Sequence, residues 1–150
     1  MNDQDCMRLA LALAAQSAAE GEVPVGAVIV RDGTVIGTGR NRRETGKNAL
    51  AHAELEAINA ACHTCGGWRL SGCTLYVTLE PCPMCAGAII NARLDRVVYG
   101  TADPKAGSCG SLVDLFTYPY NHKPLCNGGV LESDCRALLQ EFFRRLRRKE

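Results

Sequence analysis

The sequence predicts an α/β protein, a three-layer α/β/α sandwich in which helices cover a mixed five-stranded sheet. Segments with the helical spacing of apolar residues alternate along the chain with short segments typical of strands. The length of 150 residues suits a single domain, spanning 1–150. A composition of 47% hydrophobic and 22% charged residues excludes a disordered, coiled-coil or collagen-like chain.

The chain opens with a predicted helix and a predicted β-hairpin. Apolar residues recur at helical spacing over 7–18, and a glycine follows that ends the helix. The apolar run 25–30 predicts a strand, Asp32-Gly33 is a hairpin turn signal, and residues 35–41 predict the return strand.

A second helix is predicted after the polar, turn-rich residues 42–50. It carries two adjacent rows of apolar residues and ends before Gly66-Gly67. The rows are Leu55, Ile58 and Cys62 on one side and Ala53, Ala57 and Ala61 beside them.

The second half of the chain predicts three strands and two helices. Alternation over 74–79 predicts a strand, and a short helix should follow over 83–91. Residues 96–99 predict another strand, closed by a glycine and followed by a loop rich in turn formers. Residues 125–130 predict a short edge strand, and a final helix has its apolar face over 135–146.

Charge, hydropathy and cysteine content limit the function classes. The formal net charge of +1 does not by itself indicate a nucleic-acid partner. No apolar run approaches the roughly 20 residues that a membrane helix needs, and the first five residues are acidic rather than basic. Nine cysteines, an odd count without an export signal, favour reduced thiols over a disulfide framework. We therefore expect a cytoplasmic protein.

Two motifs carry the strongest chemical signal: H-A-E at 52–54 and P-C-P-M-C at 81–85. His52, Cys82 and Cys85 are candidate zinc ligands, one fewer than the four that close a structural site. A fourth position open to water indicates catalysis, and three-residue spacing at the start of a helix lets both cysteine sulfurs face one point.

Glu54 is the candidate proton carrier at this site. Inside a helix, residues two apart diverge by roughly 200°, so His52 and Glu54 must lie at a helix start to reach one water. Two thiolates cancel the charge of Zn²⁺ and weaken it as a Lewis acid, so a base is needed. Alone, each motif fits a structural zinc site or buried thiols. Together they form the H-x-E…P-C-x-x-C signature of zinc nucleobase deaminases.

Further segments extend this similarity almost from end to end. They are E-V-P-V-G-A-V at 22–28, Asn41 after the second strand, T-L-E at 78–80 and D-P-K-A-G at 103–107. With these segments the chain resembles the bacterial tRNA-specific adenosine deaminases, within the cytidine deaminase-like superfamily. The loop after residue 100 and the basic final helix are more similar to the tRNA-acting branch than to the free-base or nucleoside branches.

The resemblance implies an activity and a partner. The activity is hydrolytic deamination of the wobble adenosine, position 34, of a tRNA anticodon to inosine, with an ACG-bearing arginine tRNA as the typical substrate. The target base would be flipped out of its stack. The partner is the tRNA anticodon stem-loop, and the enzyme would be a homodimer with one catalytic Zn²⁺ per subunit.

The resemblance also implies residue roles. Glu54 would take a proton from water and pass protons to the ring nitrogen beside C6 and to the departing ammonia. Asn41 and the Ala53 amide would hold the target nucleotide, while Asp103 and Lys105 would engage flanking anticodon-loop nucleotides.

The C-terminal end offers a separate indication of RNA binding. Its last seven residues contain five positive charges, which could grip phosphates, and Phe143 could stack on an unpaired base. The alternative is that these charges complement the helix dipole and that Phe142 is core. The charged residues are Arg144, Arg145, Arg147, Arg148 and Lys149.

Two other functions stay open at this stage: deamination of a free nucleobase or nucleoside of the guanine or cytosine type, and a non-catalytic, zinc-stabilised RNA-binding module. Glu54 argues against the second, because a structural site needs no proton carrier. Cys62 and Cys65 have C-x-x-C spacing but no further ligand pair, so we interpret them as incidental thiols. Cys109 falls in the expected substrate loop, where its oxidation could interfere with activity.

Overall fold

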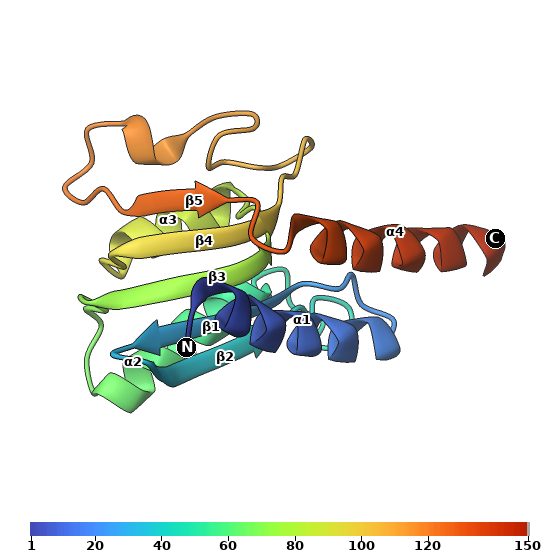
Figure 1. The fold of residues 1–150 in the computed structure, drawn as a ribbon, viewed down its shortest axis with the longest axis horizontal. Coiled ribbons are helices and arrows are strands. Elements are labelled where there is room, and N and C mark those ends of the chain that lie inside the picture. The colour runs from blue at the N-terminus through green and yellow to red at the C-terminus, as the bar shows by residue number, and fades with distance from the viewer. Residues whose placement is uncertain (150) are drawn as a thin grey trace.

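Five strands form one mixed sheet in the computed structural model, which describes residues 1–149 (Figure 1). The strand order is β2-β1-β3-β4-β5, with β1 antiparallel to both of its neighbours and β3, β4 and β5 parallel to one another. The strands are β1 (Gly26–Arg31), β2 (Thr34–Arg40), β3 (Cys73–Leu79), β4 (Arg96–Thr101) and β5 (Leu125–Gly128).

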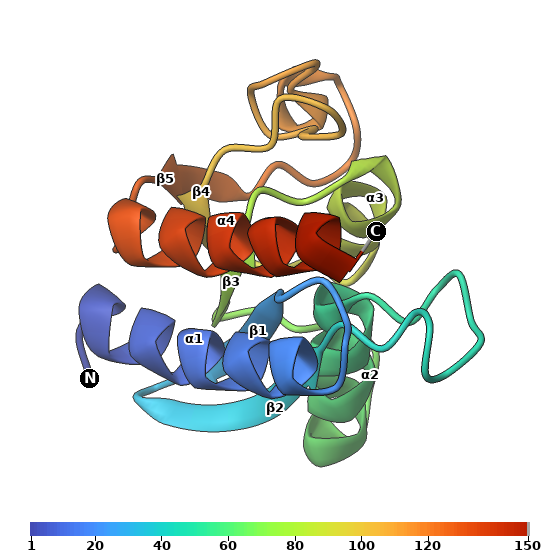
Figure 2. The same cartoon turned by 90° about the vertical axis from the view of Figure 1, so that its right-hand side faces the viewer.

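Helices cover both faces of this sheet, and Figure 2 shows α1 and α4 side by side on one of them. The α-helices are α1 (Asp3–Ala19), α2 (Ala53–Cys65), α3 (Pro83–Asn91) and α4 (Glu132–Lys149); a short 3-10 turn, η1 (Leu115–Thr117), precedes β5. No helix in the described part of the chain is long and apolar enough to cross a membrane.

Two cores result, because successive strand residues face opposite sides of the sheet. One core packs α2 and α3 against residues such as Ala27, Ile29 and Leu75, and the other packs α1 and α4 against Val28 and Val30. The predicted three-layer architecture with a mixed five-stranded sheet is confirmed.

Helix α1 begins four residues before the predicted apolar face. Asn2 and Asp5 form a capping box, in which each side chain accepts a hydrogen bond from the other's backbone N–H, at 2.8 and 3.1 Å. Near the other end Ser17 is buried, because its hydroxyl donates to the Asn41 carbonyl at 2.8 Å. Hydrogen bonding thus places a polar residue on the buried face beside the apolar Ala18.

The predictions for the C-terminal part need three corrections. Strand β4 continues through Gly100 to Thr101, where it pairs with Leu79 of β3, instead of ending at the glycine. Strand β5 ends at Gly128 rather than residue 130, where the chain turns toward α4. Cys135 is buried and Phe142 half-buried as expected, but Leu146 is 46% exposed. The end of α4 extends beyond the sheet in Figure 1, so the apolar face has nothing to pack against there.

Candidate metal centre and substrate pocket

Two helix starts bring the candidate metal ligands together. His52 is the N-cap of α2 and Cys82 the N-cap of α3, while Cys85 lies in the first turn of α3 behind Pro83, a residue that suits this position. His52 Nδ1 lies 3.7 Å from Cys82 Sγ and 3.6 Å from Cys85 Sγ. One ligand atom from each residue lies within 4.8 Å of the others, so all three can hold one metal ion.

The chemistry of these donors fits zinc. An imidazole and two cysteine sulfurs are typical zinc ligands, and three protein ligands leave a coordination position open. A hydrogen bond with Cys85, assisted by His52, lowers the pKa of Cys82 to about 4. The same bond and burial raise the pKa of Cys85, and the negative charge of the neighbouring Cys82 raises it further. A divalent ion is what would let both ionise together.

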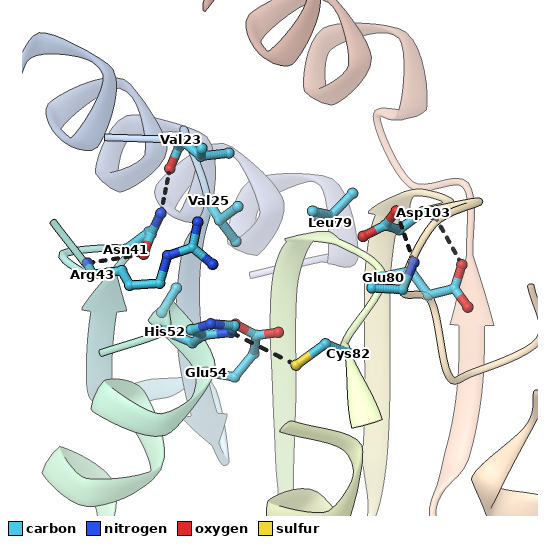
Figure 3. Close-up of a pocket in the computed structure, with 12 residues that line it drawn as sticks. Val23, Val25, Asn41, Arg43, His52, Glu54, Leu79, Glu80, Cys82 and Asp103 are labelled. Carbon is cyan, nitrogen blue, oxygen red and sulfur yellow. Dashed lines mark hydrogen bonds between the residues drawn. The ribbon is translucent and has the colours of Figure 1, made fainter. Parts of the chain in front are cut away.

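Glu54 lies in the first turn of α2, where it shares the pocket wall with His52 and Cys82 (Figure 3). Its side chain is buried, and this burial raises its pKa to about 7. A carboxyl group with such a pKa can both hold and release a proton near neutral pH.

The metal ligands and Glu54 open onto a pocket of about 190 Å³. Sites for drug-sized ligands are roughly 300–1,000 Å³, so this pocket suits a single base. Apolar side chains and one amide form much of its wall, and Ala53 contributes beside Glu54. These residues are Val23, Val25, Leu79 and Asn41.

Asn41 is held in place by the backbone on both sides of it. Its Nδ2 donates to the Val23 carbonyl at 3.0 Å, and its Oδ1 accepts from the Arg43 N–H at 3.2 Å. An amide has two donor hydrogens and two lone pairs, so one of each is left for a ligand.

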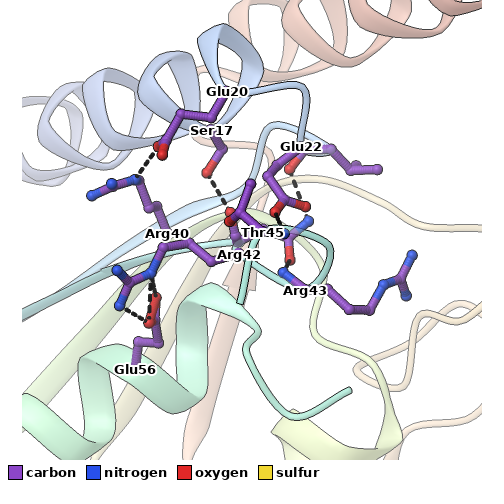
Figure 4. Close-up of polar contacts among 10 residues, drawn as sticks. Ser17, Glu20, Glu22, Arg40, Arg42, Arg43, Thr45 and Glu56 are labelled. Carbon is purple, nitrogen blue, oxygen red and sulfur yellow. Dashed lines mark hydrogen bonds and ion pairs between the residues drawn. The ribbon is translucent and has the colours of Figure 1, made fainter. Parts of the chain in front are cut away.

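Glu22, which the sequence analysis named only as the first residue of the segment 22–28, holds the loop 42–50 in place. It is buried, and its carboxylate accepts from the N–H groups of Glu44 at 3.1 Å and Thr45 at 2.6 Å (Figure 4). Burial acts to raise the pKa of Glu22, but the hydrogen bonds outweigh it and the pKa is lowered. A charged residue at the edge of the apolar segment 22–28 was the signal available in the sequence.

Glu80 has the same relation to the loop after β4. Its buried carboxylate accepts from the N–H groups of Asp103 and Cys109 at 3.0 Å and of Ser111 at 3.1 Å. Burial acts to raise the pKa of Glu80, but its hydrogen bonds lower it overall. The structure thus places a buried carboxylate beneath each of the two loops that border the pocket.

Asp103 lies in the pocket wall and Lys105 does not. The Asp103 carboxylate accepts from the N–H groups of Lys105 at 3.0 Å and Ala106 at 3.3 Å, so it shapes its own turn. Lys105 is exposed on the same loop. Cys109 is buried on that loop, where its backbone is bonded to Glu80.

The described basic residues of α4 do not line the pocket that contains His52 and Cys82. Phe143 is 41% exposed and borders a groove beside the loop 101–104. Arg144 and Arg145 both form ion pairs with Glu141, the second at 2.9 Å. The Lys149 side chain, counted above in the basic end, lies outside the described residues.

The second C-x-x-C pair does not form a comparable site. The Cys62 sulfur lies 3.8 Å from the Trp68 carbonyl, and both cysteines are half-buried. Among residues 1–149, the group of candidate metal ligands found is His52, Cys82 and Cys85.

One histidine and two cysteines at two helix starts, with a buried carboxylate beside them under a mixed sheet, define a zinc deaminase site of the cytidine deaminase-like fold. Residues 1–147 match the MafB19-like deaminase family. The chain is 47% identical over 149 residues to the tRNA-specific adenosine deaminase of Bacillus subtilis, covering 99% of this chain and 92% of that protein. The chain belongs to the tRNA-specific adenosine deaminase family.

Solved structures of two kinds of deaminase share this fold. A structure from work on A-to-I editing by tRNA:A34 deaminases superposes with a TM-score of 0.87 and 45% identity, covering 90% of this chain and 99% of that one. Guanine deaminase from Bacillus subtilis superposes with a TM-score of 0.67 and 40% identity, covering 83% of this chain and 79% of that one.

Proposed function

We propose that this protein converts the wobble adenosine of tRNA, position 34, to inosine, with an ACG-bearing arginine tRNA as its first substrate. The observation that carries this proposal is the Glu54 carboxylate beside an open three-ligand metal site. The substrate is inferred from the 47% identical tRNA-specific adenosine deaminase. A cytoplasmic location follows, because the tRNA pool is there.

His52, Cys82 and Cys85 would hold one catalytic Zn²⁺ per subunit. When bound, this ion would supply Lewis acidity that lowers the pKa of a coordinated water. Glu54 accepts a proton from the attacking water and delivers it to N1 of adenine as the C6–O bond forms. It then takes the proton of the new C6 hydroxyl and delivers it to the departing amino nitrogen, as the C6–N bond breaks and the C6=O bond forms. Water and adenosine thereby give inosine and ammonia.

Asn41 and the Ala53 amide would hold the flipped nucleotide, since both line the pocket beside Glu54. Asp103 and Lys105 would contact neighbouring nucleotides, with Asp103 acting mainly through the turn that it stabilises. Both residues lie on the loop after β4, which borders the pocket through Asp103 and Ala106.

Phe143, Arg144 and Arg145 would contact RNA beyond the pocket. Phe143 borders a groove next to the loop that carries Asp103. Exposed ion pairs such as those of Glu141 contribute little stability, so either arginine can exchange its partner for a phosphate.

The protein would act as a homodimer. Trp68 is 51% exposed and borders an apolar groove between α2 and α3 that also includes Ile58 and Ala88. A second copy would cover these apolar side chains.

Deamination of a free base is the second candidate function, because the pocket suits one base and the fold is shared with guanine deaminase. The test is inosine formation in arginine tRNA, run beside ammonia release from adenosine, guanine and cytidine. Inosine in the tRNA with no turnover of the small molecules supports the proposal. Turnover of guanine without tRNA editing would overturn it.

A further inference from the structure

Three arginines surround Asn41 in the sequence, and two of them are held in ion pairs. Arg40 Nε lies 2.8 Å from Glu20 Oε1, and Arg42 Nε lies 3.0 Å from Glu56 Oε2. Figure 4 shows both pairs on the same side of the loop. These two guanidinium groups already have anionic partners.

Arg43 differs from both of its neighbours. Its guanidinium forms no hydrogen bond or ion pair with any side chain in residues 1–149, and in Figure 4 it points away from the two pairs. It lines the substrate pocket instead, on the Asn41 side and opposite Asp103 (Figure 3). The pocket therefore has at its border a cation that is not hydrogen-bonded or ion-paired within the described residues, although its charge helps to lower the pKa of the buried Glu22.

The backbone that carries this cation is fixed although the side chain is exposed. The Arg43 N–H donates to Asn41 Oδ1 at 3.2 Å, and the next two N–H groups donate to the buried Glu22 carboxylate. The start of the Arg43 side chain is thus placed by buried groups, while its end is free to meet a ligand. An unpaired cation at the border of a cleft attracts an anionic ligand.

We propose that Arg43 binds a phosphodiester adjoining the target adenosine and thereby favours a nucleotide within an RNA chain over a free base; this inference rests on the proposed function. A pocket of about 190 Å³ holds the base, so the sugar and its phosphates stay at the mouth, where Arg43 lies. A guanidinium can donate two parallel hydrogen bonds to one phosphate. A free base carries no phosphate, so this contact adds affinity for RNA alone.

The first test changes the RNA and leaves the protein intact. Anticodon stem-loops are made with one uncharged methylphosphonate, placed either 5′ or 3′ of the target adenosine. For one of the two positions, kcat/KM of the unsubstituted zinc-loaded protein should fall about 10- to 100-fold, the range for a charged hydrogen bond. That loss should be absent in Arg43→Gln, whose contact is already missing.

The second test changes the protein. Arg43→Gln should lower kcat/KM on the unmodified stem-loop by the same factor and reduce the slope of log kcat/KM against log salt by about one. Arg43→Lys keeps the charge but not the paired donors, so its kcat/KM should lie between those of the unsubstituted protein and Arg43→Gln. Arg8→Gln is the matched control, because Arg8 is exposed on α1 in an ion pair with Asp5.

Two results would overturn this inference. They are equal kcat/KM for Arg43→Gln and the unsubstituted protein, or a loss below about twofold from both methylphosphonates. Activity of the unsubstituted protein on the unmodified stem-loop distinguishes failure of this inference from failure of the proposed function. If the protein edits the stem-loop and Arg43→Gln has no effect, only the phosphate contact is refuted. If the protein does not edit the stem-loop, the proposed function is refuted as well.

Discussion

Glu22, Glu54 and Glu80 are all buried, and their surroundings give them opposite properties. Glu22 and Glu80 each accept two or more backbone hydrogen bonds, which outweigh burial and lower their pKa values. For Glu54 burial dominates, and its pKa is raised to about 7. The first two therefore stabilise loops as fixed anions, while Glu54 can exchange a proton.

Replacing Glu54 by alanine should abolish turnover without removing the metal. A general acid–base group contributes roughly 10²- to 10⁴-fold to the rate. Because Glu54 serves several proton transfers, kcat on tRNA should fall by about 10⁴-fold or more. Zinc content measured by mass spectrometry should stay at one per subunit. Glu56→Ala, two residues along the same helix, is the control and should retain activity. Unchanged turnover in Glu54→Ala would remove it from the mechanism.

Glu80→Gln should change how stability depends on pH. The folded-state pKa of Glu80 lies below its ordinary value of 4.5, so its ionised form stabilises the fold at neutral pH. This contribution is lost as the pH falls through the folded-state pKa. We expect the variant to be less stable by about 1–3 kcal/mol at pH 7, because a backbone donor loses its acceptor.

The measurement is urea denaturation of both proteins from pH 7 to pH 3. The difference in unfolding free energy should shrink below about pH 4.5, where protonation removes the contribution from the unsubstituted protein. Glu56→Gln provides the comparison for an ion pair at the surface. A difference that is the same at both ends of the pH range would contradict this account.

At the scale of the elements, α2 packs onto β2 through glycine. A Cβ on Gly39 would collide with the Ala53 carbonyl and with Ala57, and one on Gly37 would collide with the next turn of the helix. His52 precedes the first turn of α2, and Glu54 lies within it. The distance between α2 and the sheet therefore determines where both side chains lie.

Gly39→Ala should therefore lower both stability and metal retention. Overpacking typically costs about 1–3 kcal/mol, and displacement of α2 would move His52 away from the cysteines. Thermal unfolding and zinc loss to a chelator measure the two effects. The control is Gly67→Ala, because a Cβ there meets nothing within 4 Å. Equal zinc retention in both variants would show that the contact at Gly39 does not determine the position of His52 relative to the two cysteines.

Much of the fold could be predicted from periodicity, because the core helices and strands bury regular faces. The ends of elements could not. Ser17 is buried through a hydrogen bond to a residue 24 positions away, and Leu146 is exposed because the sheet does not reach it. Both depend on tertiary neighbours, which local spacing does not contain.

At the scale of the whole molecule, motif and spacing predicted that the candidate metal ligands and Glu54 would lie together, as they do in the structure. The pocket position of Arg43 and the loop contacts of Glu22 and Glu80 were not predicted. The missed residues depend on which side chains already have partners, and this is decided by packing. Arg42 and Arg43 are adjacent and identical in type, yet only Arg42 meets a carboxylate in the described structure.

The homodimer proposal gives a prediction at this scale. Trp68 is exposed beside the groove of α2 and α3, with the Arg69 guanidinium 4.2 Å from its ring centre. Trp68→Glu would place a charge in a surface that a second copy covers, so light scattering should show a shift from dimer to monomer. Leu125→Glu, at a 71% exposed position on β5, should leave the dimer intact. A monomeric unsubstituted protein would refute the proposal.

The candidate metal ligands come from the starts of two different helices, and this affects the conformational entropy of the chain. His52 and Cys82 are 30 residues apart, and the segment between them contains all of α2 and β3. A metal ion bound to both would close a ring through this segment, and a closed ring has fewer conformations than an open chain. Openings that separate the starts of α2 and α3 would then be rarer, and the pocket between them would keep its shape from one substrate to the next.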